Sequence, residues 1–469
     1  MNLPPQSIHV WRQCNTLAVA RNFHEENMDI LKPRVDGRLD QSGVTGMQFP
    51  SYEYLVALGY GLVGEHQWVH RTVSFIIYCF GAWGIYELFL VLFHSSWAAA
   101  LGAWSFCWSP ELFYFGISAL PDVLALVCSI WGLTLFLWWN KSGKVFWLLP
   151  SWFATTLGGL TKIQFLVVGF PMAVLVVRDW KKWKPRQWAA FVLYGATCVG
   201  LTLAWYHYAE ILIATTGLSD FGLYFKPAQG WIPALKTIWH NAVSEIPELL
   251  LNYATFVFFV VGVVAFWKPG WQRSEWFTPI AIWGAGVLAY YLIELGQMGA
   301  HSYYLLPFLP LLLVVVVKGG MILRESRFRP FFLVLLVLQP VMALIRIVPP
   351  RFLAKDKAVP QELYAEDSRE RLEKAVPNQA LCLVGPDGSG CIYFYFLHKK
   401  GFGFSRLEDL EENLKGIPVI EEDIHRGAEY LYTNDLSISD RKVLAPYLQS
   451  EILREGNFQV YKLWIRSKK

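Results

Sequence analysis

The sequence is poor in charged residues over most of its length. Asp, Glu, Lys and Arg make up 17% of its 469 residues, whereas soluble proteins usually carry about 25%. Of the 37 acidic residues, 19 lie between positions 351 and 469, so the first three quarters are depleted in acid. This shortage excludes a soluble enzyme of ordinary composition. It divides the chain into a long apolar part, roughly 1–350, and a charged tail.

Several features of other protein classes are also missing. The net charge is only +4, and no basic run with interleaved aromatic residues lies outside the short loops, so nucleic acid is not an expected partner. None of the 7 cysteines forms a Cys-x-x-Cys pair, which argues against a zinc or thiol redox motif. The Gly-rich stretch 385–390 has no lysine and therefore does not fit a phosphate-binding loop.

Long apolar runs are abundant. A membrane-spanning helix needs about 20 mostly apolar residues, and ten segments approach this length. They are 72–93, 97–116, 121–139, 146–160, 163–177, 188–208, 250–267, 277–294, 303–317 and 331–348. The fourth and fifth segments are short and tightly joined, which is typical of a tilted or re-entrant pair. The sequence predicts an α-helical polytopic membrane protein.

The loops between these segments differ in basic residues. Loops facing the cytoplasm carry an excess of Lys and Arg. One alternate set holds thirteen basic residues: Lys141, Lys144, Arg178, Lys181, Lys182, Lys184, Arg186, Lys268, Arg273, Lys318, Arg324, Arg327 and Arg329. The opposite set holds three: Lys162, Lys226 and Lys236. We therefore expect the first set in the cytoplasm, and residues 1–71, the 209–249 loop and the tail outside.

Three regions follow from this topology. Residues 1–71 form a first outer loop, in which 14–28 and 52–63 are apolar at helical spacing but too short to span, so they predict helices along the membrane surface. Residues 72–348 form the transmembrane domain, and residues 349–469 an extramembrane domain. Because residues 1–7 cannot cross a bilayer, we expect a preceding span that delivers the first loop.

The tail reads as a small α/β domain. Its apolar and β-branched runs predict strands over 380–384, 429–432 and 458–464, and its mixed charged runs predict helices over 407–414 and 441–453.

Polar residues at outer helix ends are candidates for function, because burying them near a bilayer is costly. Asp122 opens the third span, Lys162 lies between the fourth and fifth, His207 ends the sixth, and His301 precedes the ninth. Each also has a structural explanation. Asp122 could cap a helix, Lys162 could snorkel to a lipid headgroup, and the residues at 301–304 could form an aromatic belt.

The outer segments resemble a known family. The resemblance lies in seven ordered motifs: His9-x-Trp-Arg-Gln-x-x-Thr with Ala20-Arg-Asn-Phe, Pro33-Arg-Val-Asp36, Phe49-Pro50, Leu120-Pro-Asp122, Leu160-Thr-Lys162, Trp205-Tyr-His207 and His301-x-Tyr-Tyr-x-Leu-Pro307. Together they look like the bacterial GT-C glycosyltransferases, the family-39-like enzymes related to protein O-mannosyltransferases and to the lipid A aminoarabinose transferase. The resemblance covers about 9–350, and the tail looks like the periplasmic domain that such proteins often carry.

The resemblance implies transfer of a hexose or pentose from a polyprenyl-phosphate donor to a lipid, glycan or protein acceptor. The reaction would take place on the periplasmic side of a bacterial inner membrane. It also implies an acidic base in the first outer loop, sometimes paired with a second acid and a metal. A carboxylate must accept the acceptor's proton, and cations must stabilise the departing lipid phosphate.

This chain departs from that pattern at two positions. Asn15 and Gln48 stand where the resemblance leads us to expect Asp and Glu. An amide keeps the shape of an acid but accepts no proton. Asp36 and Asp122 are therefore the candidate catalytic carboxylates. The two amides weaken the case for a divalent metal, and no other cofactor is expected.

Substrate-binding roles are expected at the remaining matched positions. Arg12 and Lys162 would meet the donor phosphate, since arginine in particular matches phosphate oxygens. The other candidates are His9, Asn15, Gln48, His207, His301, Tyr303 and Tyr304.

Two alternatives to a transferase stay open. The amides would suit a catalytically impaired protein on the same scaffold that binds a lipid-linked sugar or a partner enzyme. A surface polysaccharide polymerase or ligase would share the topology, with the 209–249 loop as its outer loop.

Overall fold

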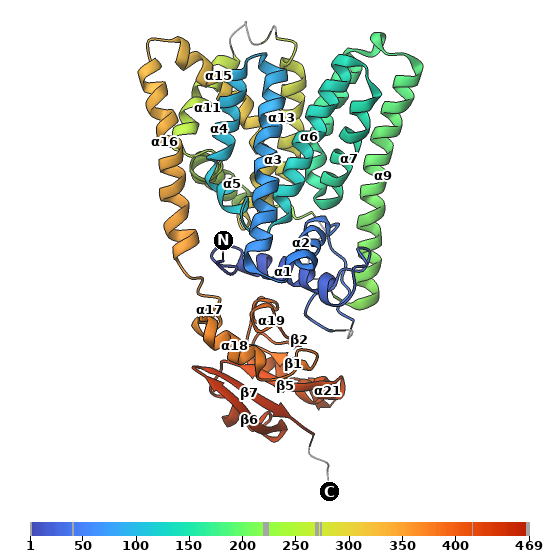
Figure 1. Ribbon diagram of the computed structural model, residues 1–469, viewed down its shortest axis with the longest axis vertical. Coiled ribbons are helices and arrows are strands. Elements are labelled where there is room, and N and C mark those ends of the chain that lie inside the picture. The colour runs from blue at the N-terminus through green and yellow to red at the C-terminus, as the bar shows by residue number, and fades with distance from the viewer. Residues whose placement is uncertain are drawn as a thin grey trace.

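The computed structural model describes residues 2–39, 42–218, 225–267, 272, 274–414 and 416–465, and the statements below concern these residues. A bundle of long helices stands on a small sheet domain, and two short helices lie crosswise between them (Figure 1). Lys268 and Arg273, two members of the basic loop set, lie outside the described residues.

The bundle contains every predicted apolar segment as helix. Its principal helices are α3 (Gln67–Phe93), α4 (Ser96–Cys107), α5 (Pro110–Phe115), α6 (Pro121–Ser142), α7 (Val145–Thr161), α8 (Gly169–Arg178), α9 (Pro185–Thr216), α11 (Tyr253–Phe266), α13 (Phe277–Ile293), α15 (Leu309–Glu325) and α16 (Arg329–Ile347). The predicted segment 97–116 is two helices, because Ser109 caps a new helix that begins at Pro110.

Fewer helices than predicted are long enough to cross a bilayer alone. Five qualify by length and hydropathy: Gln67–Phe93, Pro121–Ser142, Pro185–Thr216, Ser302–Glu325 and Arg329–Leu353. A sixth crossing is possible if Trp231–Leu250 and Tyr253–Phe266, which are bent by 117°, count as one broken span. The other bundle helices are shorter apolar pieces such as Ile163–Arg178 and Phe277–Ile293.

Short helices connect the bundle. They are η1 (Ile163–Val168), η2 (Trp180–Lys182), α10 (Trp231–His240), η3 (Asn241–Leu250), α14 (Leu295–Met298), η4 (Ser302–Phe308) and η5 (Val348–Leu353). Two of them matter for the site, because η1 follows Lys162 and η4 follows His301.

Of the first two helices, the first is buried along most of its length, whereas the second leaves Leu55, Leu58, Leu62 and Val63 exposed. α1 (Val10–Glu25) and α2 (Ser51–Val63) lie across the end of the bundle, and the sheet domain covers α1 from the other side (Figure 1). As a result, α1 buries polar side chains that would usually face water: Arg12, Gln13, Asn15, Thr16, Arg21 and Asn22. Burial of so many polar groups is costly unless they have partners or a function.

The C-terminal domain is a five-stranded sheet in the order β2-β1-β5-β7-β6. β1 (Leu381–Val384) runs parallel to both β2 (Lys400–Gly403) and β5 (Ala428–Thr433), while β6 (Leu448–Glu455) and β7 (Phe458–Leu463) form an antiparallel hairpin beside them. Its helices are α17 (Gln361–Tyr364), α18 (Glu366–Lys374), α19 (Ile392–Leu397), α20 (Leu407–Glu411) and α21 (Val419–His425); shorter pieces are β3 (Asn413–Leu414), β4 (Ile417–Pro418), η6 (Ile438–Asp440) and η7 (Ala445–Tyr447).

The tail differs from prediction at several elements: α17, α18 and α21 were not predicted, and the predicted helix 407–414 ends at Glu411. The predicted helix 441–453 contains Pro446, which cannot continue a helix, and the chain instead enters β6 at Leu448. Gly456, at φ 59°, makes the turn that pairs β6 with β7. The strand β2 was not predicted, because two of its four residues are glycines, which are uncommon in strands.

The sheet domain is joined to the first outer loop by backbone hydrogen bonds. Gly401 donates to the carbonyl of Asp36 at 3.1 Å and accepts from Arg38 at 2.6 Å, so the loop extends the sheet beyond β2. One hydrophobic core also runs from Cys14 and Leu17 of α1 to Phe394 of α19. The tail and the first loop therefore form one packed unit.

Candidate active site

Asp122 and Lys162 meet where two bundle helices end beside α2. Asp122 is fully buried in the first turn of α6, and its Oδ1 lies 3.8 Å from Nζ of Lys162. No side chain caps the start of this helix. Asp122 therefore does not have the capping role that the sequence allowed. The Lys162 side chain is 11% exposed, and its Nζ lies 5.5 Å from the centre of the Tyr304 ring. It therefore points into the protein.

Glu53 adds a second carboxylate that the sequence analysis missed. It lies in the first turn of α2, is 0% exposed, and neither oxygen has a hydrogen-bond partner in another described residue. Burial raises its pKa to about 7, against the lowering effects of its own backbone N–H, Arg12 and Lys162, and Asp122 raises it further. The signal available in the sequence was a single acid within an otherwise apolar helix.

Arg12 completes a group of four buried charges, which we call the charged cluster: Arg12, Glu53, Asp122 and Lys162. Arg12 is 4% exposed on α1, and its charge acts on both Glu53 and Lys162. Two acids and two bases thus share a site with little access to water. Buried charges of this kind are seldom kept without a function.

An aromatic group lies against the charged cluster. The His9 ring is 5.2 Å from that of His301 and 5.0 Å, edge-on, from that of Tyr303. His301 stacks near Tyr304 at 5.9 Å, and Tyr304 contacts Lys162. Burial lowers the pKa of His9 to about 3, and the charges of His301, Arg351 and Arg12 lower it further, so His9 is neutral at physiological pH.

The two amide positions lie in segments that border the cluster. Asn15 is buried one turn after Arg12, and its Oδ1 has no hydrogen-bond partner in the described part of the chain. Gln48 is also buried, and its Nε2 similarly lacks a partner there. The residue after it, Phe49, donates its N–H to the carbonyl of Leu160 at 3.0 Å, two residues before Lys162.

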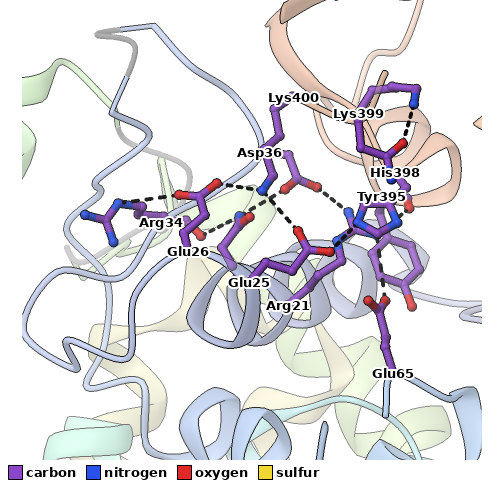
Figure 2. Close-up of polar contacts among 12 residues, drawn as sticks. Arg21, Glu25, Glu26, Arg34, Asp36, Glu65, Tyr395, His398, Lys399 and Lys400 are labelled. Atoms are coloured by element: carbon purple, nitrogen blue, oxygen red, sulfur yellow. Dashed lines mark hydrogen bonds and ion pairs between the residues drawn. The ribbon is translucent and has the colours of Figure 1, made fainter. Parts of the chain in front are cut away.

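The structure separates Asp36 from this cluster. Its carboxylate receives a hydrogen bond from Arg21 at 2.9 Å and another from Asn22 at 3.0 Å (Figure 2). Arg21 and Asp36 are 3% and 2% exposed. With both oxygens occupied and the charge matched by Arg21, Asp36 holds the first outer loop against the sheet domain.

His207 also lies apart from the cluster. α9 continues to Thr216 instead of ending near 208, and the His207 side chain is 75% exposed, near Glu210. Its neighbour Tyr206 points inward, where its hydroxyl accepts the N–H of Ile163 at 3.3 Å, directly beside Lys162.

One set of side chains among the described residues is spaced for a metal ion. The ligand atoms of Glu25, Glu65 and His398 lie within 4.8 Å of one another. Both ring nitrogens of His398 are already engaged, by Glu25 at 2.6 Å (Figure 2) and by Glu373 at 3.0 Å. Arg21 lies 3.9 Å from Glu65. The protein's own cations therefore match these carboxylates, and the set acts as an ion-pair network between the outer loop and the tail.

The fold matches solved structures of ArnT and of an oligosaccharyltransferase. ArnT from Cupriavidus metallidurans bound to undecaprenyl phosphate aligns with a TM-score of 0.69 over 98% of this chain and 95% of that chain, at 12% identity. The same protein in the apo state gives 0.61 over 96% and 93%, also at 12% identity. The chain has the GT-C fold. The Archaeoglobus fulgidus oligosaccharyltransferase in complex with Zn and sulfate gives a TM-score of 0.51 at 12% identity, over 93% of this GT-C chain and 65% of the other.

A sequence match relates this GT-C chain to a transferase family. Residues 48–206 match the dolichyl-phosphate-mannose-protein mannosyltransferase family. The matched region begins at Gln48 and contains Glu53, Asp122 and Lys162, so three of the four charged-cluster residues lie within it. No curated protein matches the chain significantly. The predicted GT-C resemblance is thus confirmed.

Proposed function

We propose that this GT-C protein transfers a sugar from a polyprenyl-phosphate donor to an acceptor on the periplasmic side of a bacterial inner membrane. The observation that carries the proposal is the charged cluster, where Arg12 and Lys162 are buried together at one end of the bundle. Two cations in a poorly hydrated site can stabilise the charge that develops on a departing phosphate. The related ArnT fold, solved with undecaprenyl phosphate, supports a lipid-phosphate donor.

The cluster also supplies acid–base groups. When the acceptor hydroxyl or amine attacks the anomeric carbon, a carboxylate must take its proton. Asp122 is either that base or the partner that holds Lys162 in place. His9, His301, Tyr303 and Tyr304 line the site beside the phosphate-binding cations, as aromatic rings that can pack against the sugar or the lipid.

Placement outside the cytoplasm rests on charge. The thirteen basic loop residues lie on the opposite face of the predicted topology from Lys162 and the tail. The charged cluster, α1 and the sheet domain share one end of the bundle (Figure 1). A periplasmic acceptor, whether lipid, glycan or protein, would reach the cluster from this end.

The test is transfer by the full-length protein in phospholipid vesicles. The donors are undecaprenyl phosphate carrying radiolabelled mannose, glucose or aminoarabinose, and the acceptor is envelope extract from the source organism. We expect release of undecaprenyl phosphate and labelling of an acceptor with one donor. Lys162→Met should lower the rate about 100-fold or more, whereas Lys144→Met, an exposed lysine elsewhere in the bundle, should leave it unchanged. Equal rates in both variants would overturn the phosphate-binding role.

The two amides favour one other function, a protein that binds a lipid-linked sugar without turning it over. Asn15 and Gln48 replace acids that the resemblance leads us to expect, and an amide accepts no proton. The double variant Asn15→Asp, Gln48→Glu distinguishes the two functions. A wild-type protein without turnover, together with a double variant that gains it, would support the binding protein. Turnover by the wild type supports the transferase.

A further inference from the structure

Glu53 is the less compensated of the two carboxylates in the charged cluster. Asp122 has the ammonium of Lys162 at 3.8 Å and lies in the first turn of α6, where the helix dipole favours negative charge. Glu53 has no ion pair within 4 Å among the described residues and no hydrogen-bond partner in another described residue. It is also 0% exposed, so water does not solvate it. A carboxylate that is neither paired nor hydrated takes up a proton more readily than one that is.

The site needs a carboxylate that accepts a proton, and its two amide positions do not provide one. Asn15 and Gln48 are buried beside the cluster, each with a polar atom that lacks a partner in the described chain. Asp36 is held by Arg21 and Asn22. Of the carboxylates discussed, only Glu53 and Asp122 share the site with Lys162 and Arg12.

α2 is fixed so that Glu53 faces the cluster. The hydroxyls of Ser51 and Thr161 lie 2.7 Å apart, which ties the start of α2 to the residue before Lys162. On the other side, the hydroxyl of Tyr52 lies 2.7 Å from that of Ser74 on α3. These two contacts flank Glu53 and set the direction of its side chain, a requirement for a group that must meet a reacting proton.

We infer that Glu53 is the general base of the transfer reaction and that Asp122 is a positioning residue that holds Lys162. This inference rests on the proposed transferase function and names the base within the same site. It assigns to α2 a catalytic carboxylate at a position where the sequence motifs quoted above contain none.

The acceptor's O–H or N–H bond breaks, and its proton goes to a Glu53 carboxylate oxygen. The acceptor's electron pair forms the new bond to the anomeric carbon. The bond from that carbon to the phosphate oxygen breaks, and its electron pair leaves with the polyprenyl phosphate. Arg12 and Lys162 meet the resulting charge, while Asp122 stays paired with Lys162.

Kinetics of full-length variants in vesicles test the assignment. Glu53→Gln should lower kcat about 10²- to 10⁴-fold, the usual contribution of a general base, with unchanged affinity for undecaprenyl phosphate alone. Asp122→Asn should instead raise KM for the donor and weaken that affinity, because it frees Lys162. The wild-type kcat/KM should fall as pH drops below about 7, and this fall should be absent in Glu53→Gln. The charges facing Glu53 come from Arg12, Asp122 and Lys162.

Two further variants separate chemistry from folding. Tyr54→Phe changes the residue after Glu53, whose ring packs against Phe23 instead of the charged cluster, and should keep kcat within about twofold of wild type. Glu53→Asp keeps the charge but retracts the carboxylate. It should fold and bind undecaprenyl phosphate like wild type, with kcat at least about 10-fold lower. If Glu53→Gln does not fold, the kcat of Glu53→Asp tests whether Glu53 is the base.

The possible outcomes differ clearly. If the wild-type protein is active and either Glu53→Gln or Glu53→Asp has the same kcat, Glu53 is not the base. The proposed function would then still stand. A wild type that binds undecaprenyl phosphate but transfers no sugar from any donor would overturn both.

Discussion

Replacing Asp36 by Asn tests whether this residue of the first outer loop is a catalytic base or a structural ion-pair partner. Nη2 of Arg21 lies 2.9 Å from Oδ2 of Asp36, and both side chains are at most 3% exposed. Removing one partner of such a pair leaves a buried charge and costs about 3–5 kcal/mol. Glu65 remains 3.9 Å from Arg21 and compensates in part, so we expect about 3 kcal/mol, near the lower limit. At about 1.4 kcal/mol per tenfold change, the population of the undocked loop and sheet domain should rise roughly 100-fold.

The assay pairs hydrogen exchange with transfer activity. Asp36→Asn should speed exchange of the Gly401 and Arg38 amides, which link the loop to β2, while activity per folded molecule stays within about threefold of wild type. Asp29→Asn, in the same loop, is the matched control and should change stability by less than about 0.5 kcal/mol. If Asp36→Asn abolishes transfer but leaves the exchange of the Gly401 and Arg38 amides unchanged, Asp36 is a catalytic base and not a structural residue.

Two further predictions concern the tail and α9. Burial opposes the charged form of His398, but hydrogen bonds to Glu25 and Glu373 raise its pKa above 6.5, so its contribution to docking is complete below pH 6.5 and is lost as pH rises through the raised value. Burial likewise opposes ionisation of Glu25, but the hydrogen bond from His398 lowers its pKa from 4.5 to about 2, so that contribution is lost as pH falls toward 2. Docking measured by hydrogen exchange should therefore be tightest between about pH 4.5 and 6.5 and looser at pH 9. His398→Gln should remove this difference. Equal protection of the wild type at pH 6 and pH 9 would contradict the prediction. On α9, His207→Ala should leave transfer within about twofold, since the side chain is 75% exposed, whereas Tyr206→Phe should lower it, and the opposite ranking would contradict the assigned faces.

Composition and apolar periodicity were enough to predict the membrane class and the helix positions. They were not enough for span number, because a run of apolar residues does not reveal a break such as that between Cys107 and Pro110. In the tail, Pro446 was available in the sequence as a sign against the predicted helix. The pairing of β6 with β7 is set by tertiary contacts that no local pattern encodes.

Members of the candidate site were predictable where they lie at helix ends. Asp122, Lys162 and His301 were found because a polar residue beside an apolar run is conspicuous, and the topology placed their helix ends on one side. Glu53 was not predicted because the charges around it lie far away in the chain: Arg12 comes from α1, Asp122 from the start of α6 and Lys162 from the end of α7.

Two other differences have simple geometric causes. Asp36 looked like a base in isolation, but Arg21 lies on the facing helix α1 and neutralises it. Tyr206 and His207 are adjacent in the sequence, yet successive residues on a helix point about 100° apart. Sequence reasoning named His207, whereas the side chain of this segment that faces inward is Tyr206.

In the proposed reaction, the charged cluster holds the phosphate of the lipid donor. A cryo-electron microscopy map of the full-length protein with saturating undecaprenyl phosphate tests it most directly. We expect phosphate density within hydrogen-bonding distance of Lys162 Nζ and the Arg12 guanidinium, beside Tyr304. Phosphate density at the basic loop around Lys181 and Lys182, or a cluster without lipid at saturation, would contradict it.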